Sequence, residues 1–389
     1  MRGWWIIAVI GCRHGFDGVD PAQTDAPTDD VDIEHVDLCG DGDGLAPNAP
    51  WPLIHGCRTN AGRSPYLGPE SRASSLGPVS MDAGWTGIVI DAGDRALFSV
   101  YNPGTASAFD LVTGEKKFGV PAPGALPWLA LGAQQDVYVG SDHGVFYCFD
   151  AISGAERWRK QIGGSLQAPM LALGNVYFGT ETYGVWAVDT TTRAEKWHFD
   201  VPGGGRVAAL AFAAGRLYFV DTLASYLYAL DAASGEQVFA VPITGGPLGS
   251  PVVGIDTVYV ATTTRGIAAF DLSSGELRWQ QPEAGAAVVQ PALLANGDLV
   301  TTSSGGLAQV IDRATGAVRR SFAVGGTVSR PPVVAADDTT HFSTSAGIIA
   351  VDPANGNVVW QSAFRGQFAL GDRTMVVVPV EGQFAVIGR

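Results

Sequence analysis

The chain has 389 residues and a formal net charge of −14. A chain this acidic lacks the positive field that attracts a phosphate backbone, so its composition argues against nucleic acid as a partner. Glycine is abundant at 51 residues, only 16% of residues are charged, and long amphipathic windows at helical spacing are missing. These features favour many short strands joined by tight turns.

The N-terminus has the features of a secretory signal. Residues 1–12 read MRGWWIIAVIGC, in which Arg2 precedes a short apolar run. The run is too short to span a bilayer but fits a signal peptide. VIGC resembles the bacterial lipobox, which implies cleavage before Cys12 and lipidation of that residue. Acyl chains stabilise membrane binding by about 0.8 kcal/mol per buried CH₂, so they would anchor the protein without a transmembrane helix. The alternatives are a plain signal peptide and a misassigned start.

Residues 13–50 are predicted to form a disordered acidic tether. Between Asp17 and Asp43 there are ten acidic residues and no Lys or Arg, so this stretch repels itself and cannot bury a core. Residues 51–78 are interpreted as a lead-in strap that lies along the outside of the folded domain or across one of its faces. A binding role for the strap is the alternative.

Cysteine usage suggests one disulfide. Cys39 and Cys57 flank the end of the tether and the start of the strap, and an oxidising compartment would allow them to pair. A loop of this size would stabilise the fold by about 3 kcal/mol in the chain-entropy model. Two free thiols are the alternative. Cys148 lies in a continuous apolar run and is expected to be a buried, inert thiol.

A repeat of about forty residues organises the rest of the chain. Seven apolar runs end in an aspartate at intervals of 39 to 42 residues: Asp110, Asp150, Asp189, Asp231, Asp271, Asp312 and Asp352. Each unit contains four strand-like runs separated by turn residues, which is the pattern of a β-propeller blade.

Each aspartate begins a turn that most units close with glycine. The glycines are Gly114, Gly154, Gly235, Gly275, Gly316 and Gly356, whereas Arg193 takes this place in the third unit. Asp can accept hydrogen bonds from amides two residues on, and Gly supplies the positive φ, so Arg193 predicts a strained or different turn. Four residues after this position stand Trp158, Trp197, Trp279, Trp360, Phe118, Phe239 and Arg320. The rings at this position are expected to pack between neighbouring blades.

The A-x-D-x-x-[ST]-G-x-x-x-W pattern is similar to the pyrroloquinoline-quinone-like (PQQ-like) propeller repeat. The resemblance covers residues 79–389, and the family includes quinoprotein alcohol dehydrogenases and the BamB assembly lipoproteins. It implies an all-β propeller. It does not choose between an enzyme and a scaffold, because one fold supports both.

The end of the sequence suggests how the ring closes. Three strand-like runs follow the seventh unit, and Val79 to Trp85 precedes the first unit without a blade of its own. An open edge would leave backbone groups unpaired. We therefore predict eight four-stranded antiparallel blades, with Val79 to Trp85 completing the last blade and Trp85 packing there as Trp158 and Trp360 do in theirs.

No constellation for catalysis, metal binding or cofactor binding is recognised. The six histidines are scattered without metal-ligand spacing, and no nucleophile motif is present. The enzymatic branch of the family typically holds its quinone against a disulfide between adjacent cysteines, and this chain has no Cys-Cys dipeptide. The sequence therefore predicts no cofactor and a non-enzyme. A PQQ- and calcium-dependent oxidoreductase is the alternative.

The face opposite the Asp-Gly turns is the predicted binding face. Its candidate residues are Trp128, His143, Tyr183, Arg206, Arg265 and Arg330. Solvated loop residues without a ligand are the alternative. The resemblance and the signal together predict a monomeric, non-catalytic, BamB-like scaffold that binds a protein partner at the bacterial cell envelope. The expected location is the outer membrane of the cell envelope, as a lipoprotein that faces the periplasm or the cell surface.

Overall fold

The computed structural model describes most of the chain from Cys39 onward. The described residues are 39, 44–70, 74–101, 103–181, 184–281, 289–378 and 382–388, without the side chains of Trp85, Leu126 and Pro127. The predicted signal at residues 1–12, including Cys12, and nearly all of the acidic tether lie outside them. Within this part of the chain, no helix is long and apolar enough to cross a bilayer.

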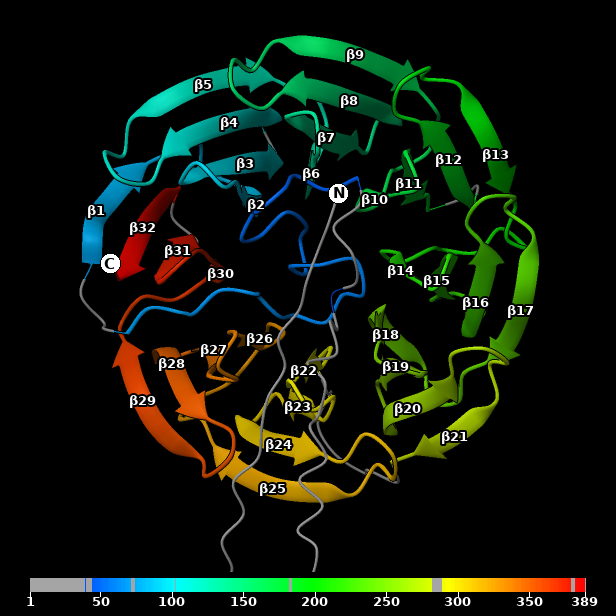
Figure 1. The fold of residues 1–389 in the computed structure, drawn as a ribbon, viewed down its shortest axis with the longest axis vertical. Coiled ribbons are helices and arrows are strands. Elements are labelled where there is room, and N and C mark those ends of the chain that lie inside the picture. Colours follow the sequence, from blue (N-terminus) through cyan, green and yellow to red (C-terminus); the bar gives the residue numbers. More distant parts are fainter. Residues whose placement is uncertain are drawn as a thin grey trace, which may run out of the picture. The chain divides into compact units, whose positions relative to one another are not determined.

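The described residues form eight four-stranded antiparallel sheets arranged as blades around a ring (Figure 1). The predicted all-β, eight-bladed propeller is thus confirmed. The first four blades are β2 (Trp85–Ile90), β3 (Arg95–Tyr101), β4 (Thr105–Asp110), β5 (Lys116–Pro121); β6 (Ala125–Gly132), β7 (Asp136–Ser141), β8 (Val145–Asp150), β9 (Glu156–Gln161); β10 (Met170–Ala172), β11 (Asn175–Gly179), β12 (Val185–Asp189), β13 (Glu195–Phe199); and β14 (Ala211–Ala213), β15 (Arg216–Asp221), β16 (Tyr226–Asp231), β17 (Gln237–Pro242). The next three are β18 (Pro247–Val253), β19 (Thr257–Thr262), β20 (Gly266–Asp271), β21 (Leu277–Gln280); β22 (Ala292–Leu293), β23 (Leu299–Thr302), β24 (Leu307–Ile311), β25 (Val318–Ala323); and β26 (Val333–Val334), β27 (Thr340–Thr344), β28 (Gly347–Asp352), β29 (Asn357–Ser362).

The eighth blade joins the two ends of the propeller. It contains β30 (Gln367–Leu370), β31 (Thr374–Val378), β32 (Gln383–Gly388) and, as its outer strand, β1 (Ser74–Ser80). An N-terminal strand therefore closes the ring as expected, but the predicted range Val79 to Trp85 is wrong. Trp85 instead begins β2, the innermost strand of the first blade.

Burial explains why the repeat reads as apolar runs. Every residue of β7 is buried, whereas the outermost strand of the same blade, β9, alternates between exposed and buried positions. The inner strands are covered by neighbouring blades on both faces, and only the outer strand meets solvent on one face. Continuous apolar runs followed by an alternating run are the expected sequence signature of such blades.

Aromatic rings join successive blades through the turn glycines. A Cβ atom placed on Gly154 would lie 2.5 Å from the ring of Phe118 in the preceding blade, and one on Gly316 equally close to Trp279. These glycines therefore make room for the rings, which lie between blades as the sequence suggests. In the sixth blade, however, Phe322 rather than Arg320 faces the next turn, at Gly356.

Where the last blade meets the first, here called the seam, aliphatic side chains take the place of the aromatic side chain that packs between other blades. A Cβ atom on Gly114 would lie 2.9 Å from Val79 and 3.3 Å from Leu76, both in β1. These two residues are also the half-buried members of β1, where the others are exposed. The packing position that the sequence analysis gave to Trp85 is thus occupied by Leu76 and Val79.

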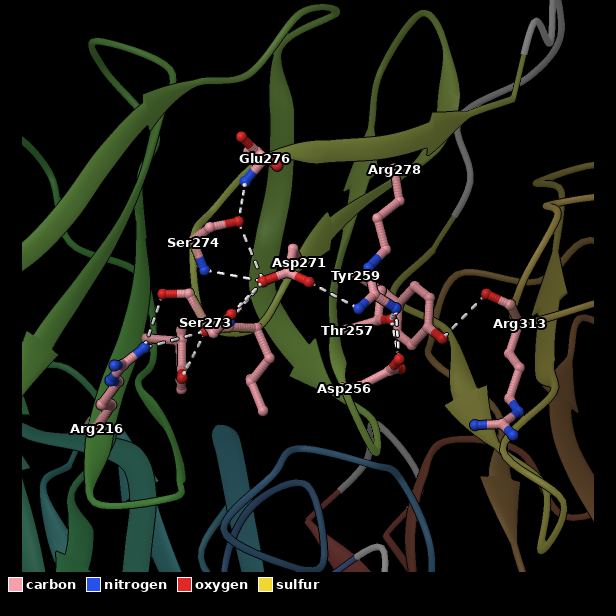
Figure 2. A network of polar contacts seen from close by, with 12 residues as sticks. Arg216, Asp256, Thr257, Tyr259, Asp271, Ser273, Ser274, Glu276, Arg278 and Arg313 are labelled. Carbon is pink, nitrogen blue, oxygen red and sulfur yellow. Dashed lines mark hydrogen bonds and ion pairs between the residues drawn. The ribbon is translucent and has the colours of Figure 1, made fainter.

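The Asp-Gly turn is built around the aspartate (Figure 2). Oδ1 of Asp271 accepts hydrogen bonds from the backbone amides and the hydroxyls of Ser273 and Ser274, and Oδ2 accepts one from Nη2 of Arg278 at 2.7 Å. The Ser273 hydroxyl and the Arg278 guanidinium hold the pKa of Asp271 well below its usual range. In the third blade Arg193 adopts φ +64°, so a non-glycine residue takes the left-handed conformation there.

Two further features of the repeat escaped the sequence analysis. A cation seven residues after the turn aspartate pairs with it in five blades, as Arg157 does with Asp150 at 2.6 Å. Tyrosines on second strands also donate hydrogen bonds to turn carbonyls of the next blade, as Tyr177 does to Ala232 at 3.0 Å. Both could have been read from the aligned repeats, because each recurs at one position of the unit.

Residues 44–70, here called the inner strap, begin inside the ring of innermost strands and then leave it between the seventh and eighth blades (Figure 1). Trp51, Leu53 and Arg58 are each no more than 3% exposed. A disulfide joins Cys57, in the middle of this segment, to Cys39, which precedes it in the chain. The packed segment therefore starts within the predicted tether 13–50 and ends before the predicted strap boundary at residue 78, because β1 belongs to the propeller.

Candidate functional site

The inner strap closes one end of the propeller channel. It exchanges backbone hydrogen bonds with the innermost strand or its following turn in every blade except the third. Examples are the amides of Ile90, Val253 and Val334, which donate to Trp51, Thr59 and Gly62. Because these positions lie at the ends of the innermost strands, the strap sits towards the face of the Asp-Gly turns.

The other side of the strap forms the floor of an axial pocket. The pocket has a volume of about 210 Å³. Trp51, Ile54 and His55 of the strap lie on one side, and the beginnings of the innermost strands of four blades form the walls. The wall residues are Trp128, Gln290, Pro291, Arg330, Pro331, Pro332, Val333, Gln367 and Phe368. The pocket therefore belongs to the face opposite the Asp-Gly turns, where the sequence analysis placed the binding residues.

Two titratable side chains line this pocket, and both are partly removed from water. Burial lowers the pKa of His55 to about 4, so its imidazole is neutral at pH 7. Burial also lowers the pKa of Arg330, although a guanidinium stays charged at any physiological pH. Among the described residues no carboxylate forms an ion pair with Arg330, and the described lining of the pocket contains no acidic side chain.

The predicted binding residues separate into two groups. Trp128 and Arg330 both line the axial pocket. His143, Arg206 and Arg265 instead lie in exposed connections at the rim, where Arg206 pairs with Glu181 at 2.7 Å. Tyr183 lies outside the described residues.

Sequence reasoning missed the strap residues of the pocket. Trp51 and His55 lie in a segment that was predicted to run outside the domain or across a face, because no local pattern shows that it lies inside the ring. Phe368 begins the last blade in a run that reads as an ordinary strand. For the wall, the x-Pro steps Gln290-Pro291 and Arg330-Pro331 at the start of two innermost strands predict positions near the channel, and both prolines line the pocket.

His341 lies next to the pocket and is fully buried. It should make the stability of the fold depend on pH in the acidic range. Its Nδ1 contacts the carbonyl of Val333, its Nε2 has no hydrogen-bond partner, and burial lowers its pKa from 6.5 to about 4. The unfolded chain therefore takes up a proton between pH 6.5 and 4 that the folded chain excludes, so stability is lost as pH falls through this range. We expect about 3 kcal/mol of lost stability from this group.

Urea unfolding at pH 7 and pH 4.5 tests this expectation. His341→Phe should lose less stability between the two pH values than the wild type does, by about 2–3 kcal/mol. His143→Phe, at an exposed histidine, is the matched control and should follow the wild type. Equal acid dependence in wild type and His341→Phe would contradict the role of His341.

The axial pocket and the closed ring can be compared with known proteins. The fold is similar to the crystal structure of BamB from Moraxella catarrhalis, with 16% identity, 82% of this chain and 97% of that chain covered, and a TM-score of 0.62. It is also similar to a europium-containing methanol dehydrogenase, with 14% identity, coverages of 88% and 91%, and a TM-score of 0.66. A quinohemoprotein alcohol dehydrogenase from Comamonas testosteroni has 13% identity and a TM-score of 0.66, with 90% of this chain and 83% of that chain covered. Identities this low show a shared fold, and that fold serves both scaffolds and enzymes.

The sequence itself gives a narrower result. No curated protein matches the chain. A family model described as outer membrane protein assembly factor BamB matches residues 102–209, 200–327 and 285–388, which together span most of the propeller. These matches cover more than half of the chain. The chain therefore belongs to the BamB family.

Proposed function

We propose that the protein is a non-catalytic, protein-binding scaffold of the bacterial cell envelope that takes part in outer-membrane protein assembly. Membership of the BamB family supports the general role. The observation that carries the proposal is the lining of the axial pocket, whose described residues offer no pair of groups suited to catalysis.

The pocket lining is poorly suited to catalysis. Its described residues include no carboxylate or thiol, and its titratable groups are Arg330 and His55. A histidine whose pKa is about 4 is a weak proton acceptor at neutral pH, and no acidic side chain of the lining orients it. General acid-base or nucleophilic catalysis needs a base matched to the working pH and a partner that positions it. Binding is therefore the function that this lining supports best.

The rim offers the recognition surface of the scaffold. His143, Arg206 and Arg265 lie on connections that project from rigid blades, and variable loops on a rigid frame are common binding elements. Positive side chains at a rim steer a partner with an acidic patch and affect its association rate.

A crosslinking pull-down from envelope membranes tests the scaffold role. The double variant Arg206→Glu and Arg265→Glu should recover markedly less of the partner that the wild type captures. Arg159→Glu is the matched control, because Arg159 is an exposed arginine on the outer strand β9. Equal recovery by the rim variant and the control would remove the rim from the interface.

The location and the alternative activity have separate tests. Labelling with a lipid precursor should be lost in Cys12→Ala, and equal incorporation would exclude Cys12 as the anchor. Incubation with PQQ and calcium should give no dye reduction with alcohols or sugars. Reproducible reduction would replace the scaffold with an oxidoreductase.

A further inference from the structure

Arg330 is the unusual residue of the axial pocket. It is half-buried in the segment before β26, and its pKa is lowered by the loss of water around it. The described residues provide neither an ion-pair partner nor a hydrogen-bond acceptor for its side chain. A charge that is desolvated without a partner reduces stability, so a chain with no use for it would be more stable with an apolar residue there.

The walls around Arg330 are mostly apolar and flat. Trp51, Trp128 and Phe368 contribute aromatic rings, and two prolines directly follow the arginine. The volume of about 210 Å³ exceeds the ~150 Å³ of an apolar cavity known to hold benzene. The pocket therefore has room for one aromatic ring and a short arm that carries an acidic group.

The pocket is built on rigid elements. Gly56 (φ +82°) lies against the Trp51 ring so closely that a Cβ atom would sit 3.0 Å from it, which fixes the floor. The side-chain amide of Gln290 donates to the carbonyl of Asn60, and the Asn60 side chain donates to the carbonyls of Leu210 and Pro251. A site held in this way loses little conformational entropy when it binds a ligand.

We propose that the axial pocket binds a carboxylate carried on an aromatic or similarly apolar group, with the guanidinium of Arg330 pairing with the carboxylate. The carboxylate of such a ligand accepts two parallel N–H···O hydrogen bonds from the guanidinium. Its apolar part is buried between the rings of the floor and the wall. This inference does not depend on the scaffold role, which concerns the rim.

Calorimetric titration of the full chain with phenylacetate and phenylacetamide tests the pairing. The two probes have nearly the same shape and differ in charge. Phenylacetate should bind at least about tenfold more tightly than the amide, because a charge-assisted bidentate pair is lost with the amide. Equal affinity for the two probes, or no binding of phenylacetate, would overturn the proposal.

Variants assign the effect to Arg330. Arg330→Met keeps an unbranched apolar stem without the guanidinium and should abolish the preference for the acid. Arg330→Lys keeps the charge but not the planar fork, so it should retain a weaker preference. Arg265→Met, the matched control at an exposed rim arginine, should behave as wild type. If Arg330→Met also behaves as wild type, the assignment to Arg330 is wrong.

The source of the carboxylate is distinguished by a second pair of probes. The peptide Gly-Gly-Phe with a free C-terminus is compared with its C-terminal amide. Preferential binding of the free acid, as tightly as phenylacetate or more so, identifies the end of a polypeptide chain as the ligand. Binding of phenylacetate without the peptide identifies a free organic acid. Binding of the peptide and binding of phenylacetate should both be lost in Arg330→Met. The scaffold role is tested separately, by the rim variants.

Discussion

Replacement of Trp51 by alanine is expected to lower the free energy of unfolding by about 3–5 kcal/mol, the usual cost of removing a large buried aromatic side chain. Trp51 is 3% exposed, packs in the core that joins the first and last blades, and exchanges two backbone hydrogen bonds with Ile90. The variant should therefore loosen the inner strap as well as create a cavity. Urea unfolding followed by far-UV circular dichroism measures the loss.

Trp186→Ala is the matched control for this substitution. Trp186 lies in β12, is half-buried, and stacks on His198 with ring centroids 4.9 Å apart. It should cost less than half as much, because much of its surface already meets solvent. Limited proteolysis should also cleave Trp51→Ala within residues 44–70 faster than the wild type. If both tryptophan variants lose the same stability, the strap does not contribute to the core as described.

Opening the seam of the ring should have the second large effect. The double variant Leu76→Ser and Val79→Ser removes the side chains that β1 packs against Gly114 of the first blade. We expect a loss of about 2–4 kcal/mol, since two half-buried aliphatic side chains are truncated and a gap forms between blades. Hydrogen exchange of the β32 amides should become faster, because β1 pairs with β32.

Exposed serines of the same strand provide the control. Ser75→Ala and Ser80→Ala leave the packed face of β1 intact and should change stability by less than about 0.5 kcal/mol. If the double variant also unfolds as the wild type does, the closing strand contributes little and each blade is stable without a closed ring.

Local sequence patterns specify the blades of this protein, whereas the choice of the closing strand depends on contacts between distant segments. The repeat, the four strands per blade and the turn chemistry were readable, because each unit carries its own apolar runs and its own Asp-Gly turn. The eighth blade was also predictable, since three leftover strands need a fourth. The choice of Ser74–Ser80 over Val79–Trp85 as that fourth strand was not, because Trp85 is equally suited to an inner and an outer strand.

The binding site shows the same division. Trp128 and Arg330 could be proposed from their places in the repeat, but nothing in the repeat indicates that they share a pocket while His143 and Arg206 remain at the rim. The floor of the pocket comes from the strap, far away in the sequence. Its contacts depend on which backbone groups are left unpaired at the ends of the innermost strands.

By itself, the sequence of this protein determined the blade, the number of blades and which strand connections share a face. Those properties follow from a local pattern that is repeated seven times and from the three strands left after it, and a ring of antiparallel blades places like positions on like faces. Only the tertiary structure decided that the inner strap closes one end of the channel and that the strap and four blades form one pocket around Arg330. Both depend on the packing of a segment outside the repeat against all the blades together, which no single unit encodes.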